Sequence, residues 1–569
     1  MFDIAQNNKS NTFDAVVIGS GISGGWAAKE LTQNGLKTLL LDRGRMVRHG
    51  DYPTANLDPW DMEHRGKTPP EEIKRDYPKQ SRFPGNVRQE TKHWFVKDPE
   101  HPYLEDRRFD WIRGNHVGGR SITWGRQCYR WSDLDFEANI REGVAIDWPI
   151  RYKDIKPWYD YVESYVGISG RREGLHHLPD GEFLKPMDLN VAELQFRDRI
   201  HQIYDDRMVT NARIANLSEP KDRGACQYRN RCKRGCPYGG YFSSVSSTIP
   251  DAERTGKLTI RPHSIAHSVI YDPNTGKASG VRVIDAETKE EMVFNARIIF
   301  VNASTLGSTQ ILMNSTSTSF PEGMGNTNGV LGKYLMDHHF LISGSGEVDG
   351  LEDYYYKGRR PGGTYMPRFR NIDAESGMKN FTRGYGLQGG GGRGTGWKQN
   401  IAELNYGKKS KEDLFKPGGP WRYGMIAFGE CLPYEDNRVY QDPNAVDQWG
   451  IPLLRFDAGW KENELEMRKD MRIQIPEMLE NAGLKNIQFN DQMSYPGQGI
   501  HEMGTARMGR NPKTSILNKW NQIHDVPNVF VTDGACMTSA GCQNPSITYM
   551  ALTARACDHA ISELNRQNL

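Results

Sequence analysis

The chain has 569 residues, a length that corresponds to three or four domain-sized units. Lysine and arginine number 73 and aspartate and glutamate number 71, so the net charge of +2 gives no strong field for nucleic acid or an anionic membrane. The composition is that of a globular protein, and it excludes a disordered or fibrous chain. No run of about 18 apolar residues is present, so no membrane-spanning helix is expected.

The first forty residues predict a dinucleotide-binding βαβ unit. A strand over Asp14–Ile18 is followed by the turn GSGISG, a helical pattern over Gly25–Thr32, and a second strand over Thr38–Leu41 that leads into Asp42. In a G-x-G-x-x-G turn the glycines allow a tight bend, close approach of a pyrophosphate, and close packing of helix on strand. The helix N-terminus then faces the anion, and Asp42 is placed to accept hydrogen bonds from ribose hydroxyls. A structural glycine-rich turn is the alternative interpretation.

The middle of the chain is less regular. Residues 45–107 are rich in Pro, Asp, His and Arg, and we expect loops there rather than a domain. A second glycine-rich segment, Arg113–Gly125, follows, and an amphipathic helix is predicted over Trp158–Val166. Strands are predicted over Leu258–Arg261, Ala278–Ile284 and Arg297–Val301.

Residues 340–490 alternate between apolar and polar positions, which is typical of an antiparallel sheet. The run Gly389–Gly392 is interpreted as a loop, with a mobile lid as the alternative. A buried strand over Val529–Thr532 then leads into Asp533-Gly534. A last helix of about fifteen residues is predicted to begin with Asn544 as its N-cap and Pro545 at its first position.

Several segments, taken in this order, resemble the glucose–methanol–choline (GMC) flavoprotein oxidoreductases. They are GSGISGG, GGRSITWG, DWPIRYKDIKPWYDYVE, LGKYLMDHH, HEMGTARMG and VTDGACMTSAGCQNPSITYMALTAR, and together they cover most of the chain. The subgroup resembled is the bacterial sugar dehydrogenases, namely glucoside 3-dehydrogenase and its glucose, fructose and gluconate dehydrogenase relatives. Those proteins carry a cysteine cluster in the equivalent place.

The resemblance implies an α/β fold in which a Rossmann-like FAD-binding domain holds an inserted antiparallel-sheet substrate domain. The FAD-binding domain is expected to comprise residues 1–50, 105–150, 225–340 and 491–569, with the cysteine loop at 223–242. The substrate domain is expected to comprise residues 151–224 and 341–490, and residues 51–104 an excursion of loops.

The resemblance also implies which residues bind FAD. For the ADP half they are Gly19, Gly21, Ile22, Ser23, Gly24, Asp42 and Arg43. For the pyrophosphate, ribityl chain and isoalloxazine they are Gly118, Gly119, Ser121, Trp124, Asp533, Gly534, Asn544 and Pro545. Some family members attach FAD covalently through a histidine in the GGxS loop. Thr123 stands in that place, so non-covalent FAD is expected.

Oxidation of an alcohol by a flavin needs a base for the hydroxyl proton, and histidine suits this because its ordinary pKa is about 6.5. His501 opens the His-x-x-Gly-Thr segment that the family uses for its catalytic histidine, and Asn544 stands where the family has its second active-site His or Asn. A histidine that only satisfies a turn carbonyl, and an asparagine that only caps a helix, are the structural alternatives. His338 and His339 are expected to be structural, although Asp337-His338 matches a family motif.

Three cysteines, Cys226, Cys232 and Cys236, fall within eleven residues and the last precedes Pro237. A disulfide would leave one cysteine over, and zinc usually needs four ligands. Short cysteine spacings followed by proline are typical of iron–sulfur sites, and three ligands favour [3Fe–4S]. Gluconate-dehydrogenase-like relatives have a further cysteine near position 229, where this chain has Arg229. The absence of that fourth ligand argues against a four-iron cluster. A metal-free loop or a zinc site stays open. Five basic residues would offset the charge of a cluster: Arg223, Arg229, Arg231, Lys233 and Arg234.

Three functions are consistent with these features. The first is a sugar dehydrogenase that oxidises a secondary ring hydroxyl, C3 of a glucoside above all, and passes electrons through the cluster to a cytochrome c or a dye. The second is an oxygen-reducing GMC oxidase with incidental cysteines. The third is a catalytically silent flavin-binding subunit.

The first residues contain neither a basic segment followed by an apolar one nor a twin-arginine pair, so no export signal is expected. Relatives of the resembled subgroup often pair with a small subunit that carries such a signal. The resemblance therefore implies a soluble chain that reaches the periplasm with a partner subunit, or stays in the cytoplasm without one.

Overall fold

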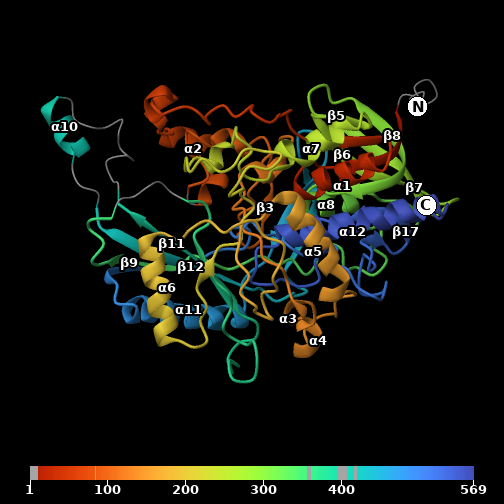
Figure 1. Cartoon of the computed structure of the whole chain (residues 1–569). Helices are drawn as coiled ribbons and strands as arrows, with labels where there is room; N and C mark the ends of the chain where they lie inside the picture. The colour runs from red at the N-terminus through yellow and green to blue at the C-terminus, as the bar shows by residue number, and fades with distance from the viewer. Residues whose placement is uncertain (1–10, 84, 355–359, 395–406, 416–418) are drawn as a thin grey trace.

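The computed structural model describes residues 11–83, 85–354, 360–394, 407–415 and 419–569 (Figure 1). Residues 1–10, on which the expectation about an export signal partly rests, lie outside these ranges. No helix in the described part of the chain is both long and apolar enough to cross a membrane.

The first sheet contains the predicted βαβ unit. Its main strands run in the order β16-β17-β8-β1-β2-β5, and β17, β8, β1, β2 and β5 pair in parallel. Their bounds are β1 Thr12–Ile18, β2 Thr38–Leu41, β5 Leu258–Arg261, β8 Glu291–Val301, β16 Gln522–Ile523 and β17 Val526–Val531. A hairpin of β6 (Ser264–Asp272) and β7 (Lys277–Asp285) joins the sheet through antiparallel pairing of β7 with β8.

The register of this sheet aligns the carboxyl ends of its central strands. Ile18 at the end of β1 pairs with Leu41 of β2 and with Val301 of β8, and Val301 also pairs with Val531 of β17. The residues that follow these strands therefore leave the sheet at one edge. In open α/β sheets that edge is where ligands bind.

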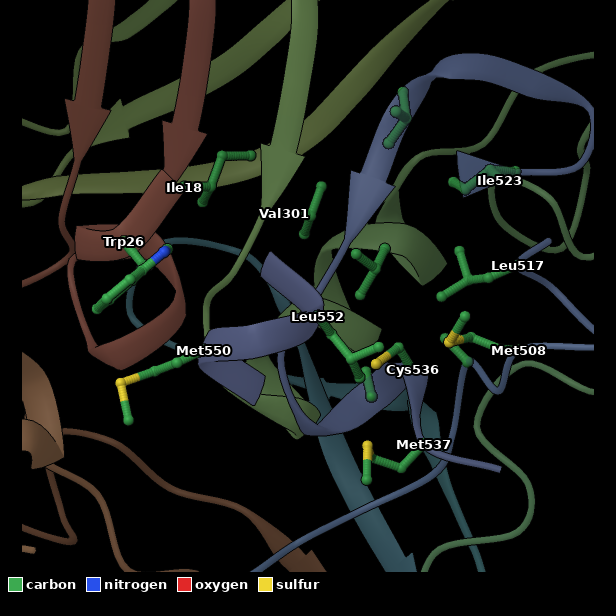
Figure 2. Close-up of a cluster of buried hydrophobic side chains, with 14 of the residues drawn as sticks. Ile18, Trp26, Val301, Met508, Leu517, Ile523, Cys536, Met537, Met550 and Leu552 are labelled. Atoms are coloured by element: carbon green, nitrogen blue, oxygen red, sulfur yellow. The ribbon is translucent and has the colours of Figure 1, made fainter. Parts of the chain in front are cut away.

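Helices cover the parallel sheet. α1 (Ile22–Gln33) contacts α12 (Ser546–Asn565) and α7 (Thr248–Arg254), and α12 also contacts α5 (Tyr152–Val166). Figure 2 shows the buried cluster between these elements, in which Ile18, Trp26, Val301 and Leu552 lie close to the ends of the strands. The site described below therefore stands on a well-packed core.

The second sheet is antiparallel and has the order β15-β9-β12-β11-β10-β4. Its strands are β4 Thr210–Asn211, β9 Ile342–Val348, β10 Thr364–Met366, β11 Tyr385–Arg393, β12 Trp421–Gly429 and β15 Lys485–Asp491. Helices α6 (Val191–Ile203) and α11 (Glu462–Asn481) pack on it and share one buried cluster with it (Figure 1). The predicted fold class, a Rossmann-like α/β domain with a separate antiparallel sheet, is confirmed.

The remaining elements are small. A three-stranded sheet joins β13, β14 and β3, whose bounds are Arg438–Val446, Pro452–Asp457 and Leu104–Glu105. The other α-helices of the described chain are α2 Pro70–Asp76, α3 Asp133–Phe136, α4 Ala138–Glu142, α8 Thr305–Asn314 and α10 Lys408–Phe415.

The Gly389–Gly392 run is not a loop, contrary to the prediction. It belongs to β11 and pairs residue by residue with β12. A Cβ atom at Gly391 would lie 2.6 Å from Asn190 Oδ1 and 3.0 Å from Ala192 Cβ, at the start of α6. Glycine is needed here because a helix end packs directly on the strand, and four glycines in a row carry no alternating pattern that could reveal a strand.

Candidate functional site

One cavity joins the dinucleotide turn to the predicted catalytic residues. It has a volume of about 480 Å³, and its lining includes Gly19–Ser23 of the turn together with His501 and Asn544. Asp42 and Asn302, which follow β2 and β8, also line it. The cavity therefore opens at the carboxyl edge of the parallel sheet, as the register requires.

The glycine turn has the geometry that its sequence predicted. Gly19 has a φ of +93°, and a Cβ atom at Gly24 would lie 1.7 Å from the Gly19 carbonyl oxygen. α1 then begins at Ile22, and its first turn contains no acidic residue. No carboxylate of α1 therefore offsets the positive end of the helix dipole, which faces the cavity.

Ser20 joins the two glycine-rich segments. Its hydroxyl donates to the Asp42 carboxylate and accepts a hydrogen bond of 2.8 Å from the Gly118 amide. Asp42 also accepts from the amides of Ser20, at 3.3 Å, and Gly44, at 2.9 Å. Burial raises the pKa of Asp42 above its ordinary value, while these hydrogen bonds oppose the rise.

The residues around the glycine turn fit the ADP half of FAD. Asn302 Nδ2 and Arg43 Nε are buried and have no hydrogen-bond partner among the residues that the structure describes, and both side chains line the cavity. Unpaired buried donors beside a free helix N-terminus suit an anionic ligand that supplies acceptors.

Most of the predicted cofactor residues line this one cavity. They are Gly19, Gly21, Ile22, Ser23, Asp42, Arg43, Gly119, Ser121, Trp124, Asp533, Gly534, Asn544 and Pro545. Gly24 and Gly118 are not among the lining residues. A Cβ atom at either position would clash with neighbouring atoms, so both glycines are needed for the turns that carry the lining residues. Thr123, at the position of the family's covalent histidine, lines the cavity as well.

His501 and Asn544 are in contact. Asn544 Nδ2 lies 3.2 Å from His501 Nε2, and Gln388 Nε2 donates to Asn544 Oδ1 at 2.7 Å. On the other side of the ring, His501 Nδ1 lies 2.8 Å from His338 Nδ1. Residues from four distant segments thus form one chain of hydrogen bonds around the His501 ring.

Asp337 positions the segment that carries His501. Its carboxylate accepts hydrogen bonds from the amides of Gly497 and Gly499, at 2.8 Å each, and of His501, at 3.1 Å. Burial raises the pKa of Asp337 to about 7. The pKa of His501 is lowered well below 6.5, first by burial and then by His338 and Arg120, so its imidazole is neutral at neutral pH.

A partly buried ion pair stands close to His501. Arg120 donates to both carboxylate oxygens of Glu502, at 3.0 and 2.8 Å, and both residues line the cavity. Asp533, at the end of β17, accepts from the Ser308 hydroxyl at 2.5 Å and the Ala535 amide at 3.0 Å. Burial raises the pKa of Asp533 to about 6.

An aromatic wall lies next to His501. Phe340 is stacked between Phe83 and Phe428, with ring-centroid distances of 5.9 and 5.5 Å. The Phe428 ring lies 6.2 Å from that of His501, and all three phenylalanines line the cavity. The base candidate therefore borders an apolar surface on one side and amides on the other.

Two expectations about side chains near His501 were wrong or incomplete. The N-cap of α12 is Pro545 and not Asn544, whose side chain makes no cap hydrogen bond and contacts His501 and Gln388 instead. His338 was expected to be merely structural, yet it contacts His501. The motif LGKYLMDHH was the available signal for His338, whereas nothing in the sequence pointed to Gln388.

The structure does not support the expected iron–sulfur cluster. Cys226, Cys232 and Cys236 are partly exposed free thiols, and no group of three or more His, Cys, Asp or Glu side chains in the described chain is arranged to hold a metal ion. Burial raises the pKa of Cys226, and the neighbouring Cys232 and Cys236 raise it further, so its thiol form is favoured when no metal is bound.

The basic residues of this loop have other partners. Arg229 donates to the Ala55 carbonyl at 2.6 Å, Arg231 pairs with Asp58, and Arg234 donates to the Leu57 carbonyl at 3.0 Å. These contacts fasten the cysteine loop to the segment 55–58. Of these three arginines, Arg231 is paired with a carboxylate, and the predicted cluster ligands are without support.

The parallel sheet, the glycine turn and the cavity together are typical of a dinucleotide-binding protein, and His501 lines the same cavity. Sequence profiles described as GMC oxidoreductase match residues 13–340 and 433–553. The chain belongs to the GMC oxidoreductase family and is an FAD-dependent oxidoreductase.

Its relatives include dehydrogenases of several substrates. The 2-methyl-1,2-propanediol dehydrogenase of Mycolicibacterium austroafricanum is 30% identical, over 96% of this chain and 94% of its own. The fructose dehydrogenase large subunit of Gluconobacter japonicus is 25% identical, over 98% and 100%. The gluconate 2-dehydrogenase flavoprotein of Pantoea cypripedii is 24% identical, over 96% and 93%.

Proposed function

We propose that this protein is an FAD-dependent dehydrogenase that oxidises a secondary hydroxyl of a sugar or glycoside, with C3 of a glucoside as the reacting carbon. One observation carries the proposal: a neutral His501, in contact with Asn544, lines the same cavity as the dinucleotide turn. FAD, when bound, supplies the hydride acceptor.

In this proposal His501 accepts the proton of the substrate hydroxyl at Nε2. A neutral imidazole has a free lone pair for this step, and its low pKa keeps that lone pair available at neutral pH. Asn544 Nδ2 donates to the substrate oxygen and has no titrating proton that would compete.

The wall of Phe83, Phe340 and Phe428 would hold a sugar ring by contact with its apolar face, and Gln388 would donate to its hydroxyls. Relatives that oxidise fructose and gluconate support a polyhydroxylated substrate. A vicinal diol is the second candidate, and the relative that oxidises 2-methyl-1,2-propanediol favours it.

We also propose an electron acceptor other than oxygen, such as a cytochrome c or a dye, and a partner subunit with which the chain is exported to the periplasm. The names of two relatives, a large subunit and a flavoprotein, support such an assembly. No electron-transfer step is assigned to Cys226, Cys232 and Cys236, because these residues do not fit a metal cluster.

An anaerobic titration of the FAD-loaded protein tests the proposal. Glucose, methyl glucoside, a disaccharide and 2-methyl-1,2-propanediol are added separately, and flavin absorbance is followed. We expect a glucoside to bleach the flavin and NMR of the product to locate a ketone at C3. Bleaching by the diol alone would select the second candidate. Hydrogen peroxide formed in equal amount with product in air would identify an oxidase, and no bleaching by any compound would refute the proposal.

A further inference from the structure

His338 lies behind His501 and makes hydrogen bonds through both ring nitrogens. Its Nε2 lies 2.5 Å from the carbonyl oxygen of Gly541, and its Nδ1 lies 2.8 Å from Nδ1 of His501. The side chain is fully buried and is not among the residues that line the cavity. It touches the catalytic candidate but is not placed to touch substrate.

The partners of His338 determine where its proton lies. A carbonyl oxygen only accepts, so Nε2 of His338 must carry a hydrogen and donate to Gly541. Burial lowers the pKa of His338 to about 4, so at neutral pH the ring carries a single proton. Nδ1 of His338 is therefore a lone pair, and the 2.8 Å contact requires His501 Nδ1–H to be the donor.

This fixes the tautomer of His501. Because His501 is also neutral, its one proton stands on Nδ1 and its lone pair on Nε2, the nitrogen that faces Asn544. Without substrate, Asn544 Nδ2 donates to Nε2 and Asn544 Oδ1 accepts from Gln388. A substrate hydroxyl that donates to Nε2 takes the place of the Asn544 donor there. Every bond runs in one direction, from Gln388 through Asn544, His501 and His338 to the Gly541 carbonyl.

We infer that His338 is a positioning residue that holds His501 in the tautomer whose Nε2 can accept a proton. The inference rests on the base role proposed for His501. In the other tautomer Nε2 would carry hydrogen and could not act as a base. When Nε2 accepts the substrate proton, the bond from Nδ1–H to His338 becomes charge-assisted and stabilises the cation.

Other charged groups do not supply this control. Arg120 and Glu502 face His501 as an ion pair, and Asp337 accepts from the His501 backbone amide rather than from its ring. His339, the ring next to His338 in sequence, packs against Trp460. Among the described residues, His338 is the partner that contacts His501 Nδ1.

Three substitutions separate tautomer control from packing. In His338→Asn, the amide oxygen takes the place of Nδ1 and can still accept from His501. In His338→Gln, the amide reaches the place of Nε2 and keeps the bond to Gly541 without an acceptor for His501. His338→Leu keeps neither bond. His339→Leu is the matched control, because it replaces an equally buried neighbouring histidine with the same residue.

The readouts are the rate constant of flavin reduction in anaerobic stopped-flow, its pH dependence, the substrate dissociation constant and the bound FAD absorbance. We expect His338→Gln and His338→Leu to lose about 100-fold or more in the rate constant, His338→Asn to lose less than about 10-fold, and His339→Leu to stay within about threefold of wild type. FAD content and substrate dissociation constants should be unchanged.

The pH profile gives an independent check. Loss of the acceptor should move the acid inflection of His338→Leu away from that of wild type, because the contact with His501 Nδ1 is lost, whereas His338→Asn should keep an inflection near that of wild type. Equal rates in His338→Asn and His338→Gln, or a His338→Leu rate within threefold of wild type, would overturn the inference. If His338→Leu fails to bind FAD, the Asn and Gln pair decides alone. Failure of wild-type flavin reduction would instead refute the proposed function.

Discussion

The surroundings of His501 and the cysteine loop both contain side chains that could act as bases or ligands, and the two regions are built in opposite ways. His338, Gln388, His501 and Asn544 are far apart in sequence, yet their side chains meet with hydrogen-bond distances of 2.7 to 3.2 Å. The three cysteines lie within eleven residues, yet they form no group arranged to hold a metal ion.

The difference has a physical origin. The four residues around the His501 ring belong to separate segments whose positions are fixed by the packed sheets. Asp337 also holds the segment that carries His501, because it accepts hydrogen bonds from three backbone amides there. The cysteine loop takes its shape from arginines that bond to the segment 55–58. In this protein, side chains that the fold brings into hydrogen-bond contact indicate a site, whereas closeness in sequence alone does not.

The largest effect is expected at the glycine turn, which is assigned to the cofactor. In Gly24→Ala the new Cβ atom would lie 1.7 Å from the Gly19 carbonyl oxygen, so the helix and the turn cannot keep their spacing. We expect purified Gly24→Ala protein to lack flavin absorbance and activity. A fully flavinylated and active Gly24→Ala variant would contradict the assignment of this turn to FAD.

The next largest effect is expected for His501→Ala, which tests the proposed base directly. His501→Ala should keep its bound FAD, because the residue is not among those of the glycine turn and Asp42, which are assigned to the ADP half. Flavin reduction by the best substrate should fall by roughly 10²- to 10⁴-fold, the usual contribution of a general base. Stopped-flow absorbance measures this, and a rate within threefold of wild type would remove His501 from the mechanism.

The smallest effect is expected at the cysteine loop. Replacing Cys226, Cys232 and Cys236 by serine changes little in size, and we expect flavin reduction to stay within about threefold of wild type. Visible absorbance should be that of FAD alone in both proteins. Broad absorbance beyond the flavin bands in wild type that the serine variant lacks would show that the cysteines hold a cluster after all, and would reverse the comparison.

The sequence predicts the dinucleotide half well because its signals are local. The strand Thr12–Ile18, the turn with its three glycines and the following strand each follow from a few adjacent residues. The last strand and helix are also anticipated closely, although Pro545 and not Asn544 caps that helix. Backbone rules suffice where a short segment determines its own conformation.

Prediction is weaker where tertiary contacts decide. The strand through Gly389–Gly392 depends on α6 packing against it, and α11 appears where alternating patterns favoured strands. The buried residues of α11, such as Met467, Met471 and Met478, face the antiparallel sheet at helical spacing. Gln388 enters the site only because its strand passes Asn544, which no local pattern reveals.

The central claim, that His501 receives the hydroxyl proton, is tested most directly by the pH dependence of kcat/KM in wild type and His501→Ala. Because burial lowers the pKa of His501 well below 6.5, the neutral base persists as pH falls through neutrality, and the decline that His501 causes should appear only below pH 6.5. Asp337, with a pKa of about 7, is present in both proteins, so only an inflection that the variant loses belongs to His501. The account predicts that the lost inflection lies below pH 6.5. A lost inflection at or above pH 6.5, or identical profiles in the two proteins, would contradict it.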